Sequence, residues 1–509
     1  MNSVTAACLL AVSVASCRHA QPAPDPIDDL ARGADSLRAA LRIPGVSLAV
    51  VRDGKVVLAR GFGLADVEAG TRATAETLYP IGSITKTFTA TLILQLADEG
   101  RLDLDRDVAR YVDWEVAPDV RIRHVLSHTS EGVPGERFAY SSRFNWLDNV
   151  VESAAKEGFR DLLATRVLAA AGLAQTLPGE EREGYAEDLQ GLAKPYRADT
   201  SGAMVRSRYP PMELHSSSGL SSTVADLALY SIALDGGRLL SPAARARAYA
   251  PALSPAGRPF PYGLGWFTQV VGGERVVWHG SWWPDAYSGL LVKVPSRQLA
   301  LVLLANSDAL SSPQGGASNV LLFPIANAFL RTFGVGGREL AGPARVAAAL
   351  TARARGEGPK SDALLREALD CCVADLASIG DDDRLRIFGE SADPVVRAVA
   401  HQAGRRLVAA FPNDLGIRFN LGMVYGQVRP ALRIGGPDAE QALALFSTIV
   451  ESGRPIPKWM EGWSCYLIAD RIAERQPARA KVLAERALAT GVDTDGLRGR
   501  LAALLRRLP

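Results

Sequence analysis

Hydrophobic and polar residues alternate in short runs near both ends of the first 330 residues. Residues 45–63, "GVSLAVVRDGKVVLARGFG", contain two such runs on either side of Asp53-Gly54, a dipeptide typical of tight hairpin turns. Similar runs return from about residue 262, in "GLGWFTQV", "RVVWHG", "YSGLLVKVP" and "LALVLLAN". The chain between them consists mostly of helical patterns and turn-rich loops. This order predicts an α+β fold, in which an antiparallel sheet is flanked by helices and joined to a mostly helical subdomain.

Beyond residue 345 the apolar residues recur only at helical spacing. The stretches "DALLREALDCCVADL", "AEQALALFSTIV" and "ARAKVLAERALATG" show this period. The segments look like helical repeats, although no fixed repeat length emerges. We therefore predict a Gly-rich linker over 334–344 and an all-α C-terminal domain over 345–509. This domain is a candidate binding site for a protein partner.

The N-terminal stretch "TAACLLAVSVASC" is small and apolar, but too short to span a bilayer as a helix. It resembles a bacterial lipoprotein signal over residues 1–17, with Cys17 as the lipidated residue and a Pro-rich tether over 18–30. We expect export to the periplasm or outer envelope, with membrane attachment through the lipid. The leading "MNS" carries no Lys or Arg, so cleavage without lipidation is the alternative.

Composition narrows the functional classes. The 509 residues are 48% hydrophobic and 22% charged, with a net charge of +2, which is typical of a globular protein of two to four domains and not of a nucleic-acid binder. Cys371, Cys372 and Cys465 have no metal-type spacing and are interpreted as buried thiols. His124 and His128 have the spacing of a zinc helix, but Val125 stands where a metalloprotease needs Glu. We expect no metal and no cofactor.

Two Ser-x-x-Lys tetrads occur, Ser83–Lys86 and Ser153–Lys156. Lys156 lies between Glu152 and Glu157, the setting of an ordinary surface lysine. Spacing alone therefore does not distinguish the two tetrads. The residues that surround each lysine must be compared instead.

Lys86 lies at the start of an apolar run that reaches about Gly100 and has no acidic residue before Asp98. Burial without a carboxylate, and the positive end of the helix dipole, both disfavour the ammonium and lower its pKa toward that of a useful base. Ser83 lies one turn earlier on the same face. We interpret this tetrad as the chemical one.

Four ordered stretches strengthen that interpretation: "IGSITKTFTA", "HVLSHTSEGVPGERFAYSS", "SSSGLSSTVADLALYSIALDGGRLLSP" and "VVWHGSWWPDAYSGLLVKVPSRQLALVLLAN". Together they resemble the serine β-lactamase and D-alanyl-D-alanine-peptidase-like family, in its class C β-lactamase and esterase branch. The resemblance covers about residues 30–330, and it implies a hydrolase domain over 31–333.

The resemblance assigns roles residue by residue. Ser83 corresponds to the acylated nucleophile, Lys86 to its base and Tyr140 to the residue that passes a proton to the leaving group. His279 stands where the family has Lys or His and is expected to contact substrate. The oxyanion hole would be the backbone amides of Ser83 and Trp282.

At two positions the sequence departs from the family pattern, and both departures bear on which substrate the protein cleaves. Ser142 stands where the family has Asn, and Ser281 where its triplet has Gly. They make β-lactam hydrolysis less expected than cleavage of a small ester or a D-amino-acid peptide. The alternative function is a catalytically inactive binding protein whose helical domain recruits a partner.

Overall fold

The computed structural model describes residues 25–508, apart from 200–201, 312–317, 338–339, 373–375, 377–378, 429–430, 454–455 and 494–495. The predicted signal segment and Cys17 lie outside the described residues. Helix α1 spans Pro26–Ala40, with Asp25 as its N-cap. Helical structure therefore begins inside the stretch 18–30 that we predicted as a tether, because Pro26 follows a capping Asp and suits the first turn of a helix.

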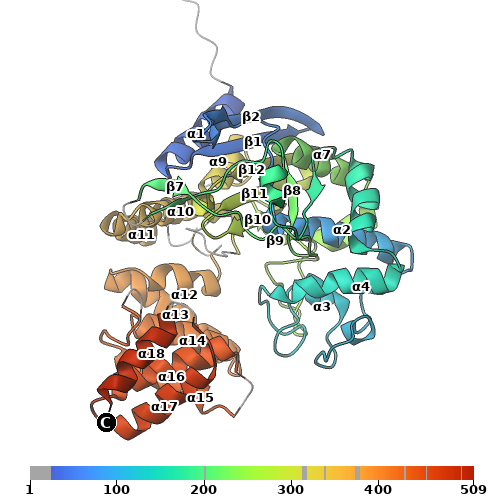
Figure 1. Cartoon of the computed structure of the whole chain (residues 1–509). Helices are drawn as coiled ribbons and strands as arrows, with labels where there is room; N and C mark the ends of the chain where they lie inside the picture. Colours follow the sequence, from blue (N-terminus) through green and yellow to red (C-terminus); the bar gives the residue numbers. More distant parts are fainter. Residues whose placement is uncertain are drawn as a thin grey trace, which may run out of the picture.

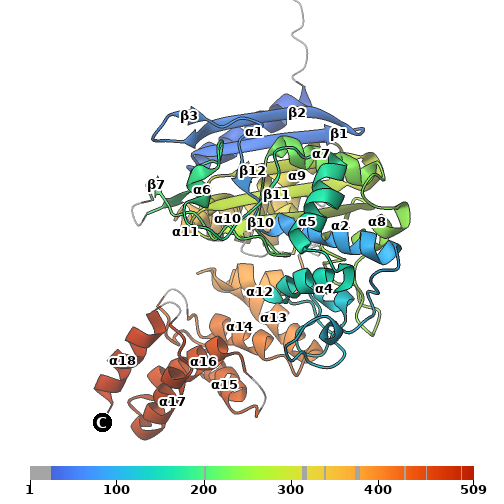
Figure 2. The same cartoon turned by 45° about the vertical axis from the view of Figure 1, so that its right-hand side comes forward.

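A seven-stranded antiparallel sheet forms the centre of the N-terminal part, in the order β3-β2-β1-β12-β11-β10-β9 (Figures 1 and 2). Its strands are β1 Gly45–Arg52, β2 Lys55–Asp66, β3 Thr71–Arg72, β9 Phe267–Val271, β10 Glu274–Trp283, β11 Tyr287–Val294 and β12 Leu299–Ala305. The hairpin predicted at Asp53-Gly54 is confirmed: both residues have positive φ, 53° and 69°, between β1 and β2. Strands from the two ends of the N-terminal part meet where β1 pairs with β12.

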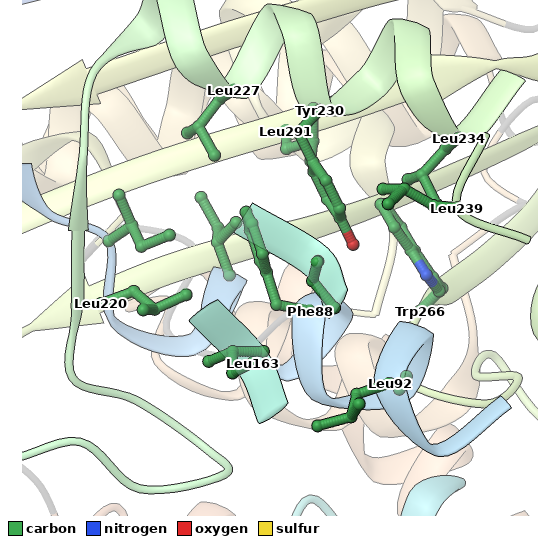
Figure 3. Close-up of a cluster of buried hydrophobic side chains, with 14 of the residues drawn as sticks. Phe88, Leu92, Leu163, Leu220, Leu227, Tyr230, Leu234, Leu239, Trp266 and Leu291 are labelled. Carbon is green, nitrogen blue, oxygen red and sulfur yellow. The ribbon is translucent and has the colours of Figure 1, made fainter. Parts of the chain in front are cut away.

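The sheet is covered on both faces, so its central strands are buried along their whole length. One face packs against α1 and α9, through residues such as Leu48, Leu290 and Leu303. The alternate residues, such as Ala49 and Leu291, pack on the other face against α2 and α7. Figure 3 shows this second core, where Phe88 of α2 lies against Tyr230 of α7 with ring centroids 3.9 Å apart.

Most of the remaining elements are inserted between β3 and β9. The helices of the N-terminal part after α1 are α2 Thr85–Asp98, α3 Ile122–Leu126, α4 Trp146–Ala155, α5 Phe159–Leu163, α6 Tyr185–Asp188, α7 Val224–Asp235, α8 Pro242–Tyr249 and α9 Pro324–Thr332. Short turns complete them: η1 Gly82–Ile84, η2 Val108–Arg110, η3 Ser142–Asn145, the π-helical η4 Ala164–Ala169, η5 Pro295–Arg297, η6 Asp308–Leu310 and η7 Val320–Leu322. The small strands are β4 Tyr79–Pro80, β5 Leu177–Pro178, β6 Tyr196–Ala198, β7 Met204–Arg206 and β8 Leu220–Ser222. The predicted α+β class is confirmed.

The C-terminal part is helical, as predicted. Its helices from residue 381 onward gather at the bottom of Figures 1 and 2, whereas the two before them lie higher, beside the N-terminal part. Its helices are α10 Ala341–Ala354, α11 Gly358–Cys372, α12 Asp381–Gly389, α13 Pro394–Ala410, α14 Leu415–Tyr425, α15 Ala439–Val450, α16 Lys458–Ile472, α17 Pro477–Ala489 and α18 Leu497–Arg507. Helix α10 begins within the stretch predicted as linker. Cys465 is buried and free, as expected. In the part of the chain that the structure describes, no helix is long and apolar enough to cross a bilayer.

Candidate active site

Ser83 lies at the junction of the short turn η1 and helix α2. The residues on either side of it, Gly82 and Ile84, are buried, whereas Ser83 itself is partly exposed. Gly82 has a φ of 44°, in the left-handed region. A Cβ there would lie 2.6 Å from Oγ of Ser281 and 2.9 Å from Nε1 of Trp283. Glycine is therefore required so that η1 can approach the end of β10.

Lys86 is 4% exposed and directed at Ser83. Its Nζ lies 3.2 Å from Oγ of Ser83 and donates a second hydrogen bond, 3.1 Å long, to the carbonyl oxygen of Ser217. The rings of Tyr140 and Phe144 lie beside it, with centroids 5.0 and 5.4 Å from Nζ. Two aromatic faces and a carbonyl thus replace the carboxylate that a buried lysine usually has.

The surroundings of Lys86 change its acidity. Among the described residues no carboxylate forms an ion pair with it, and burial lowers the pKa of its ammonium from 10.5 to about 7. Near neutral pH a large fraction of Lys86 is therefore unprotonated and able to accept the proton of Ser83.

The loop of residues 215–220 holds α2 in place. Oγ1 of Thr89 donates a 2.7 Å hydrogen bond to the carbonyl of Ser216, and the amide of Leu220 donates to Oγ1 of Thr85 at 3.4 Å. The carbonyl of Ser217 contacts Lys86, one turn before Thr89. Sequence reasoning missed Ser217, because a backbone carbonyl leaves no signature in residue type.

Tyr140 lies on the loop before η3, and its hydroxyl interacts with Ser83. Loss of hydration raises the pKa of its phenol well above the usual range, although the bond to Ser83 lowers it slightly. The residue as a whole is 46% exposed, so the ring reaches the surface while the hydroxyl points inward. Tyr140 is therefore a protonated phenol at neutral pH, suited to donate a proton.

His128 fixes the loop that carries Tyr140, a role that sequence reasoning missed. Its carbonyl accepts the amide of Ala139 at 2.7 Å and its Nδ1 accepts the amide of Ser141 at 3.0 Å. The imidazole also stacks on the Tyr140 ring, with centroids 4.2 Å apart and an interplanar angle of 27°. Both neighbours of Tyr140 in the chain are thus bound to one residue. In the sequence, the segment "SHTS", which contains His128, was the available signal for this role. Its contact with "AYSS" forms only in the folded chain, so local sequence pattern does not predict it.

His279 is buried against this cluster with both ring nitrogens engaged. Nδ1 lies 2.8 Å from the carbonyl oxygen of Gly280, which only accepts, so Nδ1 carries the proton. Nε2 then accepts from the hydroxyl of Tyr262 at 2.8 Å. Burial, with the nearby Lys86 charge, lowers the pKa of His279 to about 3. We expected charge or hydrogen bonds toward substrate from this side chain; it is neutral here, and neither nitrogen is free.

The end of β10 lies beside η1, as the predicted oxyanion hole requires. Oγ of Ser281 and Nε1 of Trp283 are buried and have no hydrogen-bond partner among the described residues. Trp282 is 47% exposed, and its Nε1 donates to a carboxylate oxygen of Asp308 at 3.4 Å. Ser142, by contrast, is exposed and is not brought into contact with Ser83 or Lys86 by any hydrogen bond in the described residues.

The second tetrad has none of these features. Lys156 is the exposed C-cap of α4, with a φ of 59°. Glu152 and Glu157, its expected partners, instead accept from the amide of Phe159 and the guanidinium of Arg101. The described residues also contain no group of three or more His, Cys, Asp or Glu side chains that could hold a metal ion.

Comparisons with known families and structures cover the part of the chain that holds this site. The sequence model of the family described as Beta-lactamase matches residues 30–323. The octameric penicillin-binding protein homologue from Pyrococcus abyssi superposes with a TM-score of 0.53 at 24% identity, over 61% of this chain and 78% of that one. That likeness concerns the fold.

Two curated relatives match shorter parts of the chain. Protein flp from Staphylococcus aureus is 37% identical over 120 residues, 22% of this chain and 24% of that protein. D-aminopeptidase from Brucella canis is 26% identical over 278 residues, 47% of this chain and 51% of that protein. The chain thus spans from a quarter to half the length of these relatives.

Proposed function

The chain belongs to the beta-lactamase family, and we propose that it is a serine hydrolase that cleaves an ester or amide through an acyl-enzyme on Ser83. The observation that carries the proposal is the 3.2 Å contact between Nζ of Lys86 and Oγ of Ser83, at a lysine whose pKa burial lowers to about 7. A serine hydroxyl becomes nucleophilic when a neutral base this close accepts its proton.

The proposed acylation uses three side chains. Oγ of Ser83 attacks the carbonyl carbon while its proton passes to Nζ of Lys86, and the amides of Ser83 and Trp282 hold the negative oxygen of the tetrahedral intermediate. Tyr140, kept protonated by its raised pKa, donates its proton to the leaving alkoxide or amine. The proton held by Lys86 then restores the phenol, and water hydrolyses the Ser83 ester.

The substrates we propose are a small ester or a D-amino-acid peptide, with a β-lactam less favoured. The name of the Brucella canis relative, D-aminopeptidase, supports the peptide. The exposed Ser142 in place of the family's Asn argues against a close fit to β-lactams. Export and lipidation of Cys17 also belong to the proposal, as does a protein partner for the helical domain.

Labelling of the full chain tests the proposal. A fluorophosphonate probe, followed by peptide mass spectrometry, is expected to modify Ser83, and Ser83→Ala and Lys86→Ala should abolish the adduct. Lys156→Ala is the matched control and should leave labelling unchanged. Folded protein that gives no adduct at high probe concentration would instead be the inactive binding protein. A panel of p-nitrophenyl esters, nitrocefin and D-alanyl peptides then ranks the substrates.

A further inference from the structure

A cleft of about 1950 Å³ separates the catalytic face from helices α12 and α14. Its walls include Tyr140 and Trp282 from the candidate active site and Asn420 and Met423 from α14. Sites for compact ligands usually enclose about 300–1,000 Å³. The cleft is thus larger than a small ester or a β-lactam would need. The exposed ring of Tyr140 forms part of its wall, whereas Ser83 and Lys86 do not line it.

The helical part is bound directly to the loops around the site. Arg137, three residues before Tyr140, forms an ion pair with Asp414 at the start of α14. The guanidinium of Arg258 lies 4.4 Å from the ring centroid of Phe411. The amide of Ser318 donates to Asp383 of α12 at 3.1 Å. These contacts hold the far wall against the active-site loops.

The near wall contains the edge strand of the sheet. Thr268, Gln269 and Val270 of β9 line the cleft, and β9 has a sheet neighbour on one side only. The amide of Thr268 points away from β10 and donates to the carbonyl of Pro261. Because backbone groups alternate in direction along a strand, those of Val270 point the same way. Within the described residues no hydrogen bond outside the sheet uses the Val270 amide, and this residue is 61% exposed.

We propose that α12 and α14 form the distal wall of the Ser83 substrate site, and that the cleft holds an extended polypeptide whose backbone pairs with β9 at Val270. The inference rests on the proposed hydrolase function, and it specifies that the substrate is an extended peptide. An unpaired strand edge recognises the backbone of an extended peptide. The charged and amide side chains on the walls, among them Arg258, Asp382 and Asn420, suit a peptide better than an acyl lipid.

The register sets a minimum length. Val270 lies three residues beyond Phe267, which pairs with Trp278, the neighbour of His279. Three residues of strand span about 10 Å. A peptide whose backbone runs from beside Phe267 to Val270 therefore covers at least about three residues, and a shorter substrate does not bridge these two positions.

The test is a length series on the full chain. Peptide p-nitroanilides of one to six residues, and matching peptides extended on the leaving-group side, are compared with p-nitrophenyl acetate. We expect kcat/KM to rise about tenfold or more between two and five residues on one side, as two added backbone hydrogen bonds would give. Asn420→Trp fills the cleft, and Val270→Pro removes the outward amide donor together with the valine side chain. Each should abolish the rise but leave p-nitrophenyl acetate hydrolysis unchanged.

Val482→Trp on α17 is the matched control, since Val482 is 63% exposed and does not line the cleft. It should keep the rise. A kcat/KM independent of length on both sides, or a rise that survives Asn420→Trp in folded protein, would overturn the cleft proposal. If p-nitrophenyl acetate is still hydrolysed at Ser83 in that case, the hydrolase function stands. If neither hydrolysis nor a fluorophosphonate adduct on Ser83 occurs, the proposed function fails, and the cleft proposal with it.

Discussion

The backbone amide of Ser141 donates a 3.0 Å hydrogen bond to Nδ1 of His128. Together with the bond from the Ala139 amide to the His128 carbonyl, it fixes the chain on both sides of Tyr140. The neutral imidazole therefore carries its proton on Nε2, which is buried without a partner among the described residues. Burial, aided by the Lys86 charge, lowers the pKa of His128 well below its usual value, and this keeps Nδ1 free to accept.

We predict that His128 is a positioning residue for Tyr140. His128→Leu removes the acceptor and also strains the backbone, whose φ of 53° lies in the left-handed region. It should lower kcat about 10–100-fold with little change in KM, because only proton transfer loses alignment. His128→Asn keeps a side-chain acceptor and tolerates that φ, so it should retain more activity. Steady-state kinetics on a p-nitrophenyl ester measures both variants.

A double-mutant cycle separates positioning from a general loss of stability. Tyr140→Phe removes the hydroxyl but keeps the ring stack on His128. If His128 acts through that hydroxyl, His128→Leu should cost little further activity in the Tyr140→Phe background. Additive losses in kcat would contradict the prediction and assign His128 a structural role only.

Lys86 should control the pH dependence of acylation. Its active form is the free amine, so kcat/KM should rise with pH through an apparent pKa of about 7 and then level off. The lowered pKa values of His128 and His279 place their titrations below this range, and the raised pKa of Tyr140 places its ionisation above it. A profile of kcat/KM between about pH 5 and pH 10 measures this. A fall through neutral pH would contradict it, and Lys86→Arg, which stays charged, should be inactive across the profile.

The sequence was sufficient to predict those elements whose structure is determined by local pattern. The hairpin at Asp53-Gly54, the buried strands β11 and β12, and the helix that starts just after Ser83 all follow from periodicity and turn chemistry. The burial of Lys86 without a carboxylate was likewise readable from its apolar neighbours.

The contacts that tune the site were not predictable, because they join residues far apart in the chain. Ser217 lies 131 positions from the lysine that its carbonyl binds. The orientation of the His279 ring depends on its hydrogen bond with Tyr262, a residue on another segment of the chain. The strand pattern around His279 does not predict that contact. The start of α10 inside the expected linker reflects its packing on η7, a tertiary contact that overrides a Gly-rich composition.

Lys86 should also make the folded state less stable near neutral pH. Its pKa is about 7 when folded and 10.5 when exposed, so the unfolded chain binds more protons between these values and stability rises with pH across that window. Lys86→Met should remove this rise and, at or below pH 7, increase the free energy of unfolding by on the order of 2–5 kcal/mol, after the lost bonds to Ser83 and Ser217 are counted. Denaturant unfolding at about pH 6.5 and pH 10 measures the difference.

Lys156→Met is the matched control for that measurement. Lys156 is exposed, so its removal should leave the pH dependence of unfolding unchanged. A Lys86→Met protein that is less stable than wild type at pH 6.5, or that keeps the full rise with pH, would show that the lysine is solvated or paired.

The contact between Gly82 and Ser281 predicts a loss and a rescue. In Gly82→Ala the new Cβ would meet Oγ of Ser281 at 2.6 Å and Nε1 of Trp283 at 2.9 Å, so η1 must move away from β10 and carry the Ser83 amide with it. Because an oxyanion donor is lost, kcat should fall about 100-fold or more. Ser281→Gly removes the first clash and should restore part of that activity in the double variant, leaving the indole contact and the strain of a φ of 44°. Ser281→Ala in the Gly82→Ala background still leaves a Cβ on β10 but removes the clashing hydroxyl, so it should rescue nearly as well. If neither substitution restores any kcat in folded protein, the defect lies in the backbone of Gly82 and not in its contact with Ser281.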